Sequence, residues 1–180
     1  MSNVIYFYAT DASKNIVEID LDNDYMLGDS PGYIIPLLWA AFFTTEDLQE
    51  KTSVDEFDDE IECASLITTR EKGIKLLGNK LLMLKKVLPK NCHSYVDEWY
   101  DYFSNQIDKP CLVLAINELL VNDYEEELPR FLDFSEQNLK ELIKNYSQYD
   151  LDGFDVLVGG NYIDVFDWPF EDKLTLKIKQ

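Results

Sequence analysis

The chain has 180 residues, of which 46% are hydrophobic and 28% are charged. This composition supports a buried core and excludes a disordered acidic tail. The 35 acidic and 16 basic residues give a formal net charge of -19, which argues against direct binding of nucleic acid or of an anionic membrane, because both take their affinity from cationic side chains.

The cysteines and the apolar segments indicate the cellular compartment of the protein. Cys63, Cys92 and Cys111 are an odd number at long spacings, unlike the paired cysteines of a secreted disulfide scaffold. The N-terminus lacks the positive region of a signal peptide. The longest apolar stretch, 33–43, is about half of the roughly 20 residues that a membrane span requires. We therefore expect a soluble, cytoplasmic protein.

The first quarter of the chain predicts two strands and a helix. The run 4–8 is β-branched and aromatic, as in a buried strand, and 16–21 alternates apolar with charged residues, as in a second strand. The group from Gly28 to Gly32 is expected to break the chain. An apolar segment, 34–43, follows with Pro36 near its start, which predicts a helix.

The middle of the chain predicts three more helices and an acidic connection. Thr45 and the acids after it open a short helix. Residues 54–62 include six acids in nine positions, which indicates a loop or a solvated helical turn. Leucines at steps of three and four predict a helix over 70–90, closed by Pro89. An aromatic helix is predicted over 95–107.

The last third predicts one more helix between strands. Residues 111–116 are a candidate buried strand, and Ser135 caps a helix that runs to about residue 149. Residues 154–158 and 162–166 flank a glycine pair and predict a hairpin, followed by a last strand over 174–178. The pattern favours one α+β domain over residues 1–180, with a mixed or antiparallel sheet built from strands near both termini and helices packed between them.

Charge is distributed unevenly along the chain. Residues 1–66 hold 15 acids and 2 bases, residues 67–90 hold 1 acid and 7 bases, and residues 91–180 hold 19 acids and 7 bases. The predicted helix over 70–90 is therefore the one basic segment of a negative protein. We expect its lysines to form a solvated face that meets acids elsewhere in the same chain.

No residue pattern specifies catalysis or a bound cofactor. His93 is the single histidine, and although Asp97 is placed to orient it, no nucleophile can be assigned to the pair. Asp20, Asp22 and Asp24 have the spacing of a calcium loop, but Tyr25 stands where that loop requires glycine. The sequence thus predicts no metal site, no cofactor and no enzymatic activity.

The remaining positive feature is an acidic surface with aromatic side chains. Carboxylates speed the encounter with a basic protein, and tyrosine or tryptophan supplies buried anchors in such interfaces. The candidate partner-binding residues are Asp55, Glu56, Asp58, Asp59, Glu60, Tyr100, Asp101, Tyr162 and Trp168.

The apolar stretches 4–8 (Val-Ile-Tyr-Phe-Tyr) and 33–39 (Tyr-Ile-Ile-Pro-Leu-Leu-Trp) resemble those of bacterial immunity proteins from toxin and immunity pairs. The resemblance implies a small cytoplasmic protein that occludes the active site of a cognate toxin. We expect that toxin to be a basic nuclease, with the acidic run replacing substrate phosphates. The alternatives are a general interaction module or DNA mimic that acts on a nucleic-acid-binding protein, and an enzyme of an unrecognised type.

Overall fold

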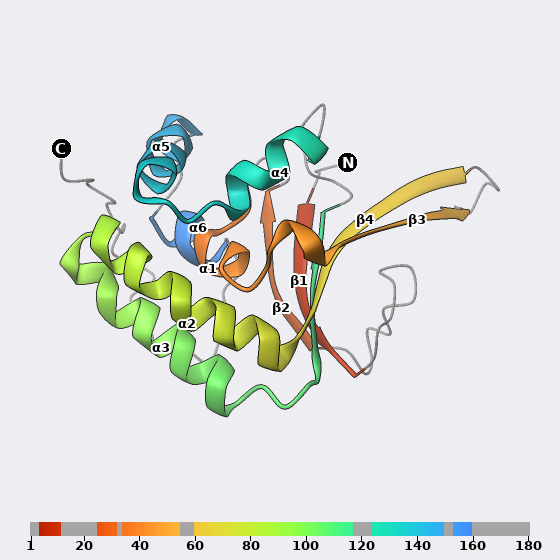
Figure 1. Cartoon of the computed structure of the whole chain (residues 1–180), viewed down its shortest axis with the longest axis horizontal. Coiled ribbons are helices and arrows are strands. Elements are labelled where there is room, and N and C mark those ends of the chain that lie inside the picture. The colour runs from red at the N-terminus through yellow and green to blue at the C-terminus, as the bar shows by residue number, and fades with distance from the viewer. Residues whose placement is uncertain are drawn as a thin grey trace.

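The computed structural model describes residues 4–11, 25–31, 34–54, 60–116, 124–149 and 153–159. It is an α+β fold, as the sequence predicts, in which helices cover one face of a five-stranded antiparallel sheet (Figure 1). The strands are β1 (Val4–Thr10), β2 (Tyr25–Pro31), β3 (Leu48–Val54), β4 (Glu60–Thr69) and β5 (Cys111–Ala115), and their order in the sheet is β2-β1-β5-β4-β3.

The helices fall between and after the strands. The α-helices are α1 (Leu37–Ala40), α2 (Arg70–Val87), α3 (His93–Asn105), α4 (Tyr124–Leu132), α5 (Glu136–Tyr146) and α6 (Gly153–Val158). Three short 3-10 turns accompany them: η2 (Thr45–Asp47), η3 (Lys90–Cys92) and η4 (Ser147–Tyr149). The predictions of β1, α2, α3, β5 and α5 are confirmed, including Ser135 as the cap of α5, whose side chain accepts a hydrogen bond from the Asn138 amide.

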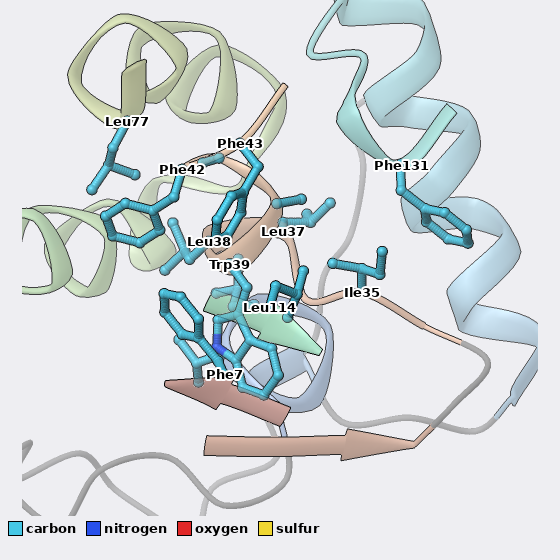
Figure 2. Close-up of a cluster of buried hydrophobic side chains, with 14 of the residues drawn as sticks. Phe7, Ile35, Leu37, Leu38, Trp39, Phe42, Phe43, Leu77, Leu114 and Phe131 are labelled. Carbon is cyan, nitrogen blue, oxygen red and sulfur yellow. The ribbon is translucent and has the colours of Figure 1, made fainter. Parts of the chain in front are cut away.

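The core lies between the sheet and the helices. Alternate residues of β1 (Ile5, Phe7, Ala9) face the helices and are fully buried. The Phe7 ring lies 5.5 Å from the rings of Trp39 and Phe42 and stacks on Phe103 of α3 at 5.7 Å. The segment around α1 thus fills the space between the sheet and the long helices (Figure 2).

Two glycine-rich predictions are wrong. The group 28–32 does not break the chain, because 28–31 belong to β2. The pairing shifts register between Phe7 and Tyr8, which leaves Leu27 as an extra residue beside Gly28. Such a bulge accommodates glycine, and an outer strand tolerates Pro31, which has no amide hydrogen for a ladder.

The predicted hairpin strand over 154–158 is instead helix α6, whose apolar residues are buried. A short apolar run does not by itself distinguish a strand from a buried helix. Gly159 has a φ of 85°, so its left-handed backbone ends a helix rather than forming a hairpin turn. The partner strand predicted over 162–166, and the strands predicted over 16–21 and 174–178, lie outside the described residues.

Three other differences concern boundaries. The helix predicted over 34–43 is limited to the four residues of α1, and Pro36 is its extended cap. The run 54–62 is not a loop throughout, because Val54 ends β3 and Glu60 begins β4. Helix α4 was not predicted, since it contains Pro129, and proline in a sequence pattern usually marks the end of a helix.

Candidate partner-binding surface

Strands β3 and β4 form a two-stranded ribbon that extends beyond the rest of the sheet (Figure 1). They pair without a register shift from Leu48 opposite Leu66 to Val54 opposite Glu60. Strand β5 pairs with β4 only over Ser65–Thr69. The side chains of Gln49, Glu50 and Thr52 are all exposed, although neighbouring residues of a strand point to opposite faces. These three residues of β3 therefore expose side chains on both faces of the strand.

Most of the charged residues of the ribbon are negative. Its strands contain Glu50, Glu60 and Glu62 against the single base Lys51. The connection between Val54 and Glu60 adds four acids to this charge, namely Asp55, Glu56, Asp58 and Asp59. These four candidate residues lie outside the described residues, but the paired strands on either side place the ends of the connection together at the far end of the ribbon.

The base of the ribbon is fixed to the body of the protein by Asp47. This buried carboxylate accepts hydrogen bonds from the amide and the hydroxyl of Thr44, at 2.8 and 2.9 Å, and pairs with the Lys72 ammonium of α2 at 2.6 Å. The hydrogen bond to Asp47 raises the pKa of Lys72. The cap of η2 is thus Thr44 rather than the predicted Thr45. Asp47 serves the fold and is not available to a partner.

The candidate residues of α3 lie on a different part of the surface. The Asp101 side chain is exposed, whereas Tyr100 is half-buried against α2. A Cβ atom added to Gly78 would meet the Tyr100 ring at 3.4 Å. Tyr100 therefore packs between two helices and is a weaker candidate for an anchor than a freely exposed ring.

The candidate residues do not form one patch. Glu60 begins β4, and the end of β4 adjoins Arg70, whose guanidinium donates hydrogen bonds to the Phe103 and Ser104 carbonyls at the end of α3. Ten residues of extended strand span roughly 30 Å, so the far end of the ribbon and the Tyr100 region are separated by about that distance. The other two candidates, Tyr162 and Trp168, lie outside the described residues.

The cations of α2 are largely used within the protein, as the sequence predicts. Lys72 binds Asp47, Lys85 pairs with Asp97 of α3, and Lys86 pairs with Glu136 of α5. Lys140 and Lys86 together lower the pKa of Glu136 to about 2 through hydrogen bonds. The basic helix is therefore no free phosphate-binding stripe.

One of these lysines makes a contact that the sequence does not reveal. The Lys80 ammonium donates to the Phe43 carbonyl at 2.6 Å, with the Ala40 and Leu132 carbonyls each at 3.4 Å, and lies 4.4 Å from the center of the Phe134 ring. Burial lowers the pKa of Lys80 to about 8. Lys80 thus joins the chain after α1 to the end of α4.

The described part of the chain offers little for catalysis. Asp97 pairs with Lys85, and the His93 ring instead contacts the Leu88 carbonyl at 3.3 Å. Burial raises the pKa of the Cys92 thiol to about 11, which makes it a poor nucleophile at neutral pH. Within the described ranges, no three His, Cys, Asp or Glu side chains are grouped so that they could hold a metal ion.

A search of the same ranges for a membrane-spanning helix found none that is both long and apolar enough. Comparisons of the chain with protein-family models, with curated proteins and with solved structures found no match. Its function is therefore inferred from the geometry and charge of the chain itself.

Proposed function

We propose that this chain is a cytoplasmic immunity or inhibitor protein that neutralises a basic toxin, of the nuclease type, through its acidic surface. The observation that carries the proposal is the β3–β4 ribbon, which projects from the sheet, exposes Gln49, Glu50 and Thr52 and has an excess of acidic residues. A narrow negative projection fits a positively charged cleft built for a phosphate backbone, and its carboxylates would occupy the phosphate positions.

The charge balance of the helices supports this proposal. Because Lys72, Lys85 and Lys86 of α2 are paired with carboxylates of the same chain, they do not neutralise the ribbon. Exposed charges attract a partner over a distance set by salt, about 10 Å at 0.1 M. The ribbon would therefore determine how fast the partner arrives and how it is oriented, without binding nucleic acid or a membrane itself.

The test is capture of the partner from the native host, followed by association kinetics at two ionic strengths. The ribbon variant changes Asp55, Glu56, Asp58, Asp59 and Glu60 to the corresponding amides. The matched control changes five exposed acids away from the ribbon, four on helices and one in the connection after α3, which changes the charge by the same amount: Glu71, Glu98, Asp108, Glu126 and Glu141.

We expect the ribbon variant to associate several-fold more slowly and with less dependence on salt, and the control to associate nearly as fast as wild type. A neutral or acidic partner, or equal rates for the two variants, would remove the proposal. A captured DNA-binding protein without toxic activity would instead support the alternative, a DNA mimic.

A further inference from the structure

Two hydrogen bonds show to which side of β3 the backbone N–H and C=O groups of each residue point. The Ile116 amide donates to the Ala64 carbonyl at 3.1 Å, so the polar groups of Ala64 face β5 and those of Ser65 face β3. Ser65 is opposite Gln49, whose polar groups therefore face β4. The alternation then directs the N–H and C=O groups of Thr52 and Val54 away from β4.

The start of β3 gives the same assignment independently. Leu48 is an even number of residues from Thr52 and Val54, so its N–H and C=O groups point to the same side of β3 as theirs. The Leu48 amide donates to the Thr45 carbonyl of η2 rather than to β4. Beyond Leu48 the outer side of β3 has no neighbouring strand among the described residues. Among the described residues, no strand therefore covers the edge that Thr52 and Val54 form, and the Thr52 side chain is exposed.

This edge lacks two of the features that block strand pairing, proline and a register shift, although β3 carries the charged residues Glu50 and Lys51. The opposite outer strand, β2, contains a register shift and ends in Pro31, and its Asp29 carbonyl is crowded by the end of α6, where a Cβ on Gly159 would approach it to 2.5 Å. Strand β3 contains no proline and no register shift. An uninterrupted edge of this kind is a template for a further strand.

Charge selects the occupant of the edge. The paired strands of the ribbon carry Glu50, Glu60 and Glu62 against Lys51, and the whole chain has a formal net charge of -19, so two copies of this chain would repel one another. A positively charged segment would instead be attracted by this net charge. A basic extended segment is the occupant that fits.

We infer that the outer edge of β3 binds an extended, lysine- or arginine-rich segment of the partner protein by strand addition, with the amides and carbonyls of Thr52 and Val54 forming the new ladder. This inference rests on the proposed function, since it specifies how the basic partner is held. Main-chain hydrogen bonds supply the affinity in this mode, and side chains on alternate positions supply the specificity.

The first experiment uses synthetic peptides and wild-type protein. The probe is a blocked octapeptide of alternating lysine and valine. One control carries a methyl group on every backbone nitrogen, which keeps the charge but removes every ladder donor, and another replaces each lysine by glutamate. We expect the lysine–valine peptide to bind at least about tenfold more tightly than either control and to protect the Thr52 and Val54 amides from hydrogen exchange.

The second experiment compares Thr52→Pro with Thr52→Ala. Because the Thr52 amide faces away from β4, proline removes a donor for the new strand while the β3–β4 ladder keeps its hydrogen bonds. Only Thr52→Pro should lose peptide binding, while circular dichroism and thermal unfolding should show that both variants remain folded.

Several outcomes would overturn strand addition: no binding of the lysine–valine peptide, equal binding of either control peptide, unprotected Thr52 and Val54 amides, or equal binding by folded Thr52→Pro and Thr52→Ala proteins. The proposed function and strand addition are refuted by different results. A native partner that requires the ribbon acids but binds Thr52→Pro normally would keep the inhibitor proposal and remove strand addition.

Discussion

Lys80 makes the stability of the protein depend on pH in a direction that can be calculated. Its pKa is about 8 in the folded protein against an ordinary 10.5. Between these values the unfolded chain binds more protons than the folded one, so the free energy of unfolding rises with pH. The rise begins near pH 8, and from pH 7 to pH 9 it amounts to about 1.4 kcal/mol for this group, since one pKa unit corresponds to about 1.36 kcal/mol.

The assay is urea unfolding of wild type and Lys80→Met at pH 7 and pH 9. Lys80→Met should lack the rise of about 1.4 kcal/mol that Lys80 gives the wild-type free energy of unfolding between pH 7 and pH 9. The stability difference between wild type and the variant should therefore change by that amount between the two pH values. Cys92, whose raised pKa opposes the effect as the pH approaches and passes 9, is present in both proteins and cancels in the difference.

Lys75→Met provides the matched control, because Lys75 is an exposed lysine of the same helix. It should retain the wild-type change between the two pH values. If Lys80→Met also retains that change, the Lys80 amine is not held by the Phe43 carbonyl in the way described, and the reasoning from its burial is refuted.

Substitutions at three glycines and one tyrosine test the packing, each by urea unfolding. Gly78→Ala should stabilise the protein by about 0.5–1 kcal/mol, because alanine favours helix and the added methyl has room beside Tyr100; a loss of stability would contradict this. Gly73→Ala, in the same helix, should destabilise by about 1–3 kcal/mol, since its Cβ would lie 3.1–3.3 Å from three buried side chains; an unchanged midpoint would show that the site has space. Gly159→Ala should cost at least about 1–2 kcal/mol, because it combines a positive φ with a contact of 2.5 Å. Tyr146→Phe should cost about 1–3 kcal/mol by leaving a buried carbonyl without its donor, and a neutral effect would show that water replaces the hydroxyl.

The elements that the sequence predicts well are those with one long buried face. The leucines of α2 at 77, 81 and 84 are all buried, and their spacing is sufficient to identify the helix. The ribbon has no such signal, because Gln49, Glu50 and Thr52 are exposed on both faces. Its existence depends on backbone pairing, which hydrophobic periodicity does not report.

The candidate site was predictable only in part, for a similar reason. The excess of acid between residues 54 and 62 is visible in the sequence, but its position at the end of a projection follows from the pairing of Val54 with Glu60. Lys80 looks like any lysine of a basic helix, because the carbonyl groups that hold it come from residues far away in the chain. Such contacts are determined by how the helices meet.

The attachment of the ribbon also has a consequence for evolution. Leu48 still packs against the core and Asp47 secures the turn before it, whereas the exposed residues that follow contribute little to stability. Substitutions on an exposed surface usually change stability by no more than about 0.5 kcal/mol. The outer ribbon can therefore diverge in sequence while the fold stays constant, so that related proteins could acquire different partners, and a designer could exchange the ribbon between them, by changes confined to this one hairpin.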